Sequence, residues 1–295
     1  MKDTRVTEME EVAIRFSGDS GDGMQLTGTL FSDASALFGN DISTFPDYPS
    51  EIRAPQGTVG GVSGFQVQVG RKQINTPGDY AHVLIAMNPA ALKANAKFMN
   101  PGGTIIFDVD SFNDKNLAKA NFKTDDPFTE CNLEDFVKIP VPMTELTRES
   151  LKEFGLDNKS ILRSKNMFAL GLVCWMFNRP LDYIDEYIKT KFGKKPGVAE
   201  SNIKVLHDGF NYGMNLQHMT PNFIVHPAEI EKGFYRNISG NIATAWGFLA
   251  ASEKSGRPLF LGSYPITPAT EILSALSERK DLGVKTFQAE DEIAG

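Results

Sequence analysis

A short stretch near the end of the chain carries residue types that could do chemistry. In GSYPITPATE, which runs from Gly262 to Glu271, one threonine, Thr267, stands between two prolines. Proline restricts both its own backbone and that of the preceding residue. The Thr267 hydroxyl would therefore be fixed at the carboxyl end of a predicted strand, where ligands of open α/β sheets bind. Thr267 could equally be the N-cap of the following helix, with Pro268 at its first position.

A cluster of carboxylates follows in the stretch QAEDEIAG. Glu290, Asp291 and Glu292 lie where a predicted strand runs into a predicted helix. Acidic residues at the start of a helix commonly do no more than interact favourably with the helix dipole. A functional carboxylate at this position would need a partner that responds to its protonation state. Both interpretations are open on spacing alone.

A glycine-rich stretch, SGDSGDG, joins the first predicted strand to the first predicted helix. Gly18, Gly21 and Gly23 would permit a tight turn and a close approach of the backbone to a ligand. Backbone N–H groups at the helix start could then hold an anion. The glycine order differs from the dinucleotide-binding fingerprint, and no Lys-Ser/Thr pair completes a P-loop. Asp19 and Asp22 would repel a phosphate unless they point away, so a purely structural turn is the alternative.

A proline-rich loop, TFPDYPSEIRAPQGT, carries one cation, Arg53. A rigid loop with one guanidinium group could clamp an anionic ligand. A surface ion pair of Arg53 with Glu51 or Asp47 is at least as consistent with the composition. The four histidines and two cysteines have no spacing typical of a metal site, an iron–sulfur cluster or a disulfide, so we expect no metal ligands in this chain.

Composition narrows the class of protein. The 295 residues carry a formal net charge of -7, with 41% hydrophobic and 23% charged residues. These values are ordinary for a globular protein, and without a basic stripe we expect no nucleic-acid partner. The N-terminus is polar and acidic, unlike a signal peptide. The longest apolar stretch, FALGLVCWMF, is too short to span a bilayer, so we expect a cytoplasmic protein without a membrane contact.

The elements that must position these residues alternate between strands and helices. This order predicts an α/β domain with a largely parallel sheet over residues 1–210. We expect an extended linker over 211–238 and the start of a second α/β domain, apparently truncated, over 239–295. Residues 41–63 are predicted to be mostly loop. The predicted strands are 12–16, 64–70, 82–88, 102–110, 136–142 and 258–262, and the predicted helices are 24–39, 89–99, 164–177, 181–193, 239–256 and 269–281. Over 283–295 we expect a strand that runs into a helix.

These motifs together resemble one family, the 2-oxoacid:ferredoxin oxidoreductases, which use thiamine diphosphate. SGDSGDGM, PSEIRAPQG and SKNMFALG resemble segments of the family's gamma domain. SGNIATAWG, SYPITPATE and QAEDEIAG are similar to the start of its pyrimidine-binding (PYR) domain. The gamma-then-alpha order is similar to that of the alpha subunit of 2-oxoglutarate and related enzymes. The resemblance covers nearly the whole chain and implies an α/β gamma-type domain with a mainly parallel sheet, followed by the beginning of a PYR domain.

The resemblance also implies roles for individual residues. In the family a glutamate hydrogen-bonds N1′ of the thiamine pyrimidine, and this role falls on Glu292, with Glu290 as the alternative. The threonine of the YPITP motif, here Thr267, lies beside the cofactor and the substrate's carboxylate or carbonyl. The further contacts that the resemblance implies are Tyr264, Pro265 and Ile266 for thiamine diphosphate, and Gly18, Gly21, Gly23 and Arg53 for coenzyme A.

The activity implied by the resemblance is oxidative decarboxylation. A 2-oxoacid, preferably 2-oxoglutarate, and coenzyme A would give acyl-CoA and CO2, with electrons passing to ferredoxin. A partner beta subunit would carry the diphosphate and Mg2+ half of the thiamine site and a [4Fe-4S] cluster, in a dimer of alpha–beta units. The chain would be active only with that partner. We expect the natural alpha subunit to continue beyond Gly295.

The alternatives concern the substrate and the class of protein. Pyruvate or a branched-chain 2-oxoacid could replace 2-oxoglutarate. A non-oxidative thiamine decarboxylase is disfavoured because such chains do not begin with a gamma-like domain. A non-catalytic nucleotide-binding or assembly subunit is the alternative from another class.

Overall fold

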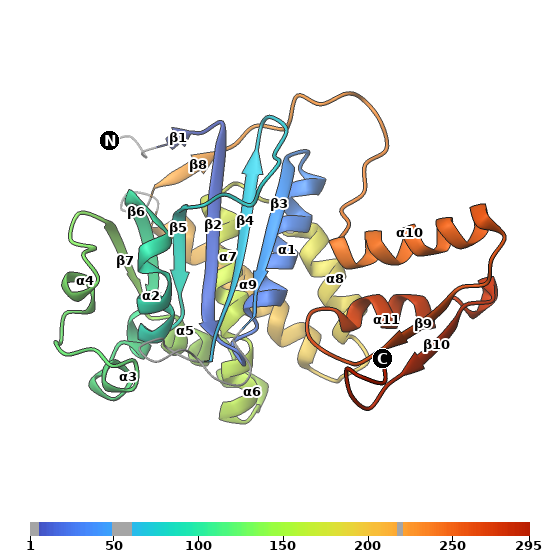
Figure 1. Cartoon of the computed structure of the whole chain (residues 1–295). Helices are drawn as coiled ribbons and strands as arrows, with labels where there is room; N and C mark the ends of the chain where they lie inside the picture. Colours follow the sequence, from blue (N-terminus) through green and yellow to red (C-terminus); the bar gives the residue numbers. More distant parts are fainter. Residues whose placement is uncertain (1–5, 49–60, 217–220) are drawn as a thin grey trace. The chain divides into compact units, whose positions relative to one another are not determined.

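The chain forms two compact units, Met1–Glu231 and Lys232–Gly295. In the part that the structure describes, the first unit contains a six-stranded and a two-stranded sheet and the second a two-stranded sheet. Their elements are seen in a computed structural model, which describes residues 6–48, 61–216 and 221–295 (Figure 1). Within these ranges, no helix combines the length and the apolar character needed to cross a membrane.

The first unit is built on a six-stranded sheet with the order β3-β4-β2-β5-β6-β7. The central strand β2 pairs in parallel with β5, which is followed by β6 and β7, also in parallel. At the other side, β4 runs antiparallel to both β2 and β3. The prediction of a mainly parallel sheet is therefore confirmed. The strands are β2 (Glu11–Asp19), β3 (Asp41–Asp47), β4 (Val62–Gly70), β5 (Ala81–Ala86), β6 (Met99–Asp108) and β7 (Val137–Val141).

The edge strand β3 lies in a segment that was predicted to be mostly loop, and that prediction is wrong for residues 41–47. Pro46 within it obscured the strand pattern. Proline cannot donate to a ladder hydrogen bond, but an edge strand tolerates it because one side of the strand is unpaired.

Helices cover both faces of the sheet (Figure 1). On one face, α1 (Met24–Leu37), α7 (Lys165–Met176) and α9 (Val198–Asn215) bury Ile14 and Phe16 of β2. On the other face, α2 (Pro89–Asn95) covers apolar residues of β5 and β6. This three-layer arrangement places the ends of the strands at the surface. The remaining helices are α3 (Asp114–Lys119), α4 (Pro127–Glu130), α5 (Met143–Ser150), α6 (Asn158–Arg163) and α8 (Asp182–Phe192).

Glycines allow α7 and α9 to touch backbone to backbone. A Cβ atom at Gly171 of α7 would lie 1.9 Å from the carbonyl oxygen of Leu206 on α9. A Cβ atom at Gly209 of α9 would lie 2.1 Å from the carbonyl oxygen of Phe168. Neither position has room for a side chain, so the two helices pack at a distance that only glycine permits.

The predicted linker over 211–238 contains regular structure. Residues 211–215 belong to α9, and β8 (Asn222–Ile224) pairs in parallel with β1 (Val6–Glu8). The linker prediction is wrong for these residues because side-chain periodicity does not reveal a three-residue strand. The chain after β8 is also anchored. Asn40 Nδ2 donates to the carbonyl of His226 at 2.7 Å, and Ala228 N donates to the carbonyl of Gly39 at 2.7 Å.

The second unit contains α10 (Gly240–Ser255), β9 (Phe260–Ser263), α11 (Thr270–Ser277) and β10 (Lys285–Gln288). Its two strands form a parallel pair. The core is small, with Ala245, Leu276 and Val284 buried between the helices and the strands. After β10, residues 290–294 form bends and a turn, and the helix predicted to follow this strand is not formed within them.

Candidate functional site

The parallel pairing of β9 and β10 brings two distant motifs to one edge of the second unit. Ser263 at the end of β9 is in register with Gln288 at the end of β10. Ala289 N donates to the carbonyl oxygen of Ser263 at 2.9 Å, which ties the two chain exits together. Because both strands point the same way, the YPITP turn and the acidic stretch leave the sheet at the same edge.

Thr267 lies in the turn before α11 and does not cap that helix. The N-cap residue is Ala269, and the helix begins at Thr270. The turn is closed by Thr270, whose backbone N–H and hydroxyl both donate to the carbonyl oxygen of Ile266, at 2.9 and 3.0 Å. Thr267 is exposed, and its hydroxyl makes no hydrogen bond to the residues that the structure describes. The helix-cap alternative is therefore wrong, and the hydroxyl is available to a ligand.

The three acidic residues after β10 divide into one structural and two available carboxylates. Asp291 Oδ1 accepts hydrogen bonds from Ile293 N at 3.0 Å and Ala294 N at 2.9 Å, which closes a local turn. Glu290 and Glu292 are exposed and have no hydrogen bond or ion pair within the described part of the chain.

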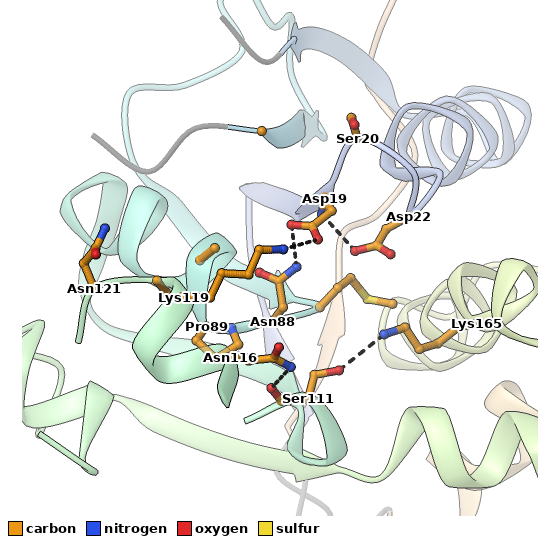
Figure 2. A pocket seen from close by; sticks show the side chains of 14 residues that line it. Asp19, Ser20, Asp22, Asn88, Pro89, Ser111, Asn116, Lys119, Asn121 and Lys165 are labelled. Atoms are coloured by element: carbon orange, nitrogen blue, oxygen red, sulfur yellow. Dashed lines mark hydrogen bonds and ion pairs between the residues drawn. The ribbon is translucent and has the colours of Figure 1, made fainter. Parts of the chain in front are cut away.

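The first unit has a polar pocket at the carboxyl ends of β2, β5 and β6, with a volume of about 430 Å³ (Figure 2). This edge is where open α/β sheets bind ligands. Part of the glycine-rich turn lines the pocket, opposite side chains from α2, α3 and the start of α7. The lining side chains labelled in Figure 2 are Asp19, Ser20, Asp22, Asn88, Pro89, Ser111, Asn116, Lys119, Asn121 and Lys165.

Two carboxylates of the glycine-rich turn, those of Asp19 and Asp22, line the pocket. Asn88 Nδ2 donates to Asp19 Oδ1 at 3.0 Å, and Asp19 N donates to Asp22 Oδ2 at 2.8 Å (Figure 2). Burial raises the pKa of Asp22, and the nearby charges of Asp19 and Asp108 raise it further, against the opposing effect of Lys165. Both carboxylates line the pocket and do not point away from it, so they would repel a phosphate group bound there.

A buried ion pair lies at the side of the pocket. Lys165 Nζ donates to Asp108 Oδ2 at 3.0 Å, and Asp108 is fully buried. Thr144 Oγ1 and Ser111 Oγ also donate to this carboxylate, at 2.6 and 2.7 Å. Burial alone would raise the pKa of Asp108, but the Lys165 charge and these hydrogen bonds together lower it.

Sequence reasoning did not single out this ion pair. A signal was present, because Asp108 ends an apolar strand run, where side chains reach the ligand edge of a sheet. Lys165 lies in the stretch SKNMFALG, 57 residues further along the chain. Nothing in the local pattern of either stretch indicated that the two would meet.

For two of the three glycines that were predicted to contact a ligand, packing within the protein itself explains why the residue is glycine. A Cβ atom at Gly18 would lie 2.6 Å from Asp22 Oδ2. Gly23 has a φ of +72°, and a Cβ atom there would lie 2.5 Å from Asn166 Nδ2. Gly21 has neither constraint, since no other atom lies within 4 Å of its Cβ position. Arg53, the fourth predicted contact for coenzyme A, lies outside the described residues.

Comparison with known proteins shows which family the chain resembles. The family model described as pyruvate ferredoxin/flavodoxin oxidoreductase matches residues 13–212. The 2-oxoglutarate oxidoreductase subunit KorA of Mycobacterium tuberculosis is 49% identical over 287 residues, which cover 97% of this chain and 44% of that protein. Subunit alpha of 2-oxoacid:ferredoxin oxidoreductase 2 of Aeropyrum pernix is 20% identical in a match that covers 97% of this chain and 48% of that subunit. The chain thus spans about half the length of these curated relatives.

A solved structure extends the similarity to both units. The 2-oxoglutarate:ferredoxin oxidoreductase from Magnetococcus marinus, with 2-oxoglutarate, coenzyme A and succinyl-CoA bound, matches with a TM-score of 0.70 and 28% identity. The match covers 97% of this chain and 44% of that one. The α/β fold predicted from the motifs is therefore shared along nearly the whole chain.

Proposed function

This chain belongs to the pyruvate ferredoxin/flavodoxin oxidoreductase family, and we propose that it forms part of a 2-oxoglutarate:ferredoxin oxidoreductase. The reaction would convert 2-oxoglutarate and coenzyme A to succinyl-CoA, CO2 and a proton. Two electrons would pass to two molecules of oxidised ferredoxin. The observation that supports the proposal is the parallel pairing of β9 and β10, because the segments that carry Thr267 and Glu290 and Glu292 then leave the sheet at the same edge.

The choice of 2-oxoglutarate is supported by the relatives. The M. tuberculosis KorA subunit, 49% identical to this chain, is named for 2-oxoglutarate. The similar M. marinus structure contains 2-oxoglutarate as well. Pyruvate and branched-chain 2-oxoacids are the competing substrates, and a direct comparison of rates decides among them.

We assign the exposed edge of the second unit to the pyrimidine half of thiamine diphosphate. When bound, that cofactor supplies the electron sink needed to remove CO2 from a 2-oxoacid. Glu292, with Glu290 as the alternative, would hold a proton against N1′ of the pyrimidine ring. Tyr264, Pro265 and Ile266 would lie against the ring. The unpaired Thr267 hydroxyl would donate to the substrate's carboxylate or carbonyl oxygen and so fix its orientation.

Our candidate contacts for coenzyme A are Gly18, Gly21 and Gly23 of the glycine turn, with Arg53 as a further contact. The three glycines do not themselves line the pocket of the first unit, but Asp19, Ser20 and Asp22 between them do. The M. marinus structure, which contains coenzyme A, supports coenzyme A as the co-substrate. Because Asp19 and Asp22 line the pocket, an uncharged part of coenzyme A suits it better than the phosphates. Amide and hydroxyl groups of the pantetheine or the nucleoside match its polar side chains.

We place the remaining chemistry on a partner subunit. The described residues include no group of three or more His, Cys, Asp or Glu side chains suited to hold a metal ion. As the resemblance to the family implies, a beta subunit would supply the diphosphate and Mg2+ site and the [4Fe-4S] cluster, and ferredoxin would collect the electrons. The relatives named above as subunits support a multi-subunit assembly.

The test is made on the complex purified anaerobically from its source. We expect coenzyme A-dependent reduction of a viologen dye with 2-oxoglutarate, and much slower reduction with pyruvate or a branched-chain 2-oxoacid. Faster turnover of another 2-oxoacid would correct the substrate. No reduction with any of them, from a complex that retains thiamine diphosphate and its cluster, would overturn the enzyme proposal and favour a nucleotide-binding or assembly subunit.

A further inference from the structure

The start of α10 is hydrogen-bonded to the turn that carries Thr267. Asn241, the second residue of α10, donates from Nδ2 to the carbonyl oxygen of Pro268 at 2.9 Å. The same nitrogen lies 3.2 Å from Glu271 Oε2, on the first turn of α11. One amide group therefore joins two segments that are 27 and 30 residues distant in sequence.

Glu271 completes a small polar bridge between the two helices. Its Oε2 atom also accepts a hydrogen bond from Ser239 Oγ at 3.2 Å. Ser239 is the N-cap of α10, where its hydroxyl accepts from Ile242 N at 3.3 Å. The carboxylate thus orients both the cap and Asn241, and Asn241 in turn reaches the Pro268 carbonyl.

The hydrogen bonds leave Thr267 between two fixed carbonyl groups. On its amino side, the carbonyl of Ile266 is held by Thr270. On its carboxyl side, the carbonyl of Pro268 is held by Asn241. A proline ring fixes φ but leaves ψ free, so the orientation of the Pro268 carbonyl depends on an outside donor. No other donor to this carbonyl occurs among the residues that the structure describes.

We propose that Asn241 is a positioning residue that fixes the Thr267 turn for the 2-oxoacid substrate. This inference rests on the proposed function, in which the Thr267 hydroxyl contacts the substrate. The role requires a hydrogen-bond donor, because the Pro268 carbonyl can only accept. Reacting groups must be held to within a fraction of an ångström for full activity, so a loosened turn lowers the rate without removing a catalytic group.

The sharpest variant is Asn241→Asp in the complete complex. Aspartate has nearly the shape of asparagine, and an acid in the first turn of a helix is favourable, so α10 should form. The new carboxylate cannot donate to Pro268 and lies beside the Glu271 carboxylate. We expect kcat/KM for the 2-oxoacid to fall by about tenfold or more, while the KM for coenzyme A stays unchanged.

The matched control is Glu271→Gln, in which the amide oxygen still accepts from Asn241. We expect near wild-type kinetics for this variant. The double variant Asn241→Asp/Glu271→Gln removes the repulsion between carboxylates but leaves position 241 without a donor, so it should stay impaired. Wild-type rates in Asn241→Asp, or full recovery in the double variant, would overturn the role of the donor.

Amide hydrogen exchange provides a readout that is independent of activity. A peptide covering residues 262–272 should exchange faster in Asn241→Asp than in the wild type or in Glu271→Gln. Unchanged exchange would overturn the inference even if activity fell. If the complex lacks 2-oxoacid activity but exchange is still faster in Asn241→Asp, the proposed function would be wrong. The role of Asn241 in fixing the turn would nevertheless be supported. Should Asn241→Asp not assemble, Asn241→Ala gives the same comparison without the added charge.

Discussion

The two glutamates after β10 lie two residues apart, and both are exposed. In the proposed function only the carboxylate that lies against N1′ of the pyrimidine would activate the cofactor. Replacing that glutamate should therefore lower activity much more than replacing the other. We expect Glu292→Gln to lower kcat of the complex by at least about a hundredfold, with assembly retained. Glu290→Gln, the matched control, should keep most of the activity. The reverse result would transfer the role to Glu290, and wild-type rates for both variants would remove it from this stretch.

The glycine turn offers a test of ligand contact without loss of fold. Gly21 has open space at its Cβ position, whereas Gly23 has a φ of +72° and Asn166 beside it. Gly21→Ala should leave the free energy of unfolding unchanged or raise it by up to about 1 kcal/mol. It should raise the KM for coenzyme A if the turn contacts that molecule. Gly23→Ala should instead lower the unfolding free energy by more than about 1 kcal/mol. An unaltered KM in Gly21→Ala would remove the coenzyme from this turn.

The shifted pKa of Asp22 predicts that the stability of the fold depends on pH. Its pKa in the folded protein is raised, chiefly by burial. The folded state therefore binds this proton more tightly than the unfolded chain does. The resulting stabilisation is complete below the pKa of the unfolded state and is lost as the pH rises through the pKa of the folded state. Asp22→Asn keeps an oxygen to accept from Asp19 N and does not titrate. We expect it to be more stabilising, relative to wild type, at pH 7 than at pH 4 in urea unfolding. The exposed Asp79→Asn serves as control, and an equal effect of Asp22→Asn at both pH values would contradict the prediction.

At the scale of elements, the contact between α7 and α9 depends on residues without side chains. A methyl group at Gly171 would overlap the backbone of α9, at 1.9 Å from the Leu206 carbonyl oxygen. We expect Gly171→Ala to separate the helices and lower the free energy of unfolding by about 3 kcal/mol or more, as overpacking against backbone does. Lys204→Ala on α9, which removes a surface ion pair with Asp208, should cost no more than about 0.5 kcal/mol. Equal effects in urea unfolding would show that the helices adjust without cost.

At the scale of the whole molecule, the two units should unfold separately. The first has an extensive core, whereas the core of the second centres on three buried side chains. The chain has two tryptophans, Trp175 in the first unit and Trp246 in the second. In urea, the fluorescence of Trp246 in a Trp175→Phe chain should change at lower concentration than that of Trp175 in a Trp246→Phe chain. The second unit should also show the smaller slope, because it exposes less surface. Coincident transitions would mean that the units unfold as one.

The sequence by itself determined the elements with strong periodicity and the short motifs between them. The apolar run around β5, the amphipathic stretch of α1 and the order of strands and helices predicted a mainly parallel α/β sheet. The prolines around Thr267 and the spacing of the glycine turn singled out candidate ligand contacts. Such features are local, because periodicity, turn residues and proline constraints act within a few positions.

Tertiary structure alone decided which distant residues became neighbours. Arg15 stands in the middle of an apolar strand, and only the fold places Asn95 and Asp47 where they bind its buried guanidinium group. In the same way, the fold joins Lys165 to Asp108, and Asn241 to Pro268. The Thr267 turn and the acidic stretch share an edge only because β9 and β10 are paired in parallel. The pairing of strands and the packing of helices minimise the free energy of the whole chain, so no local pattern contains them.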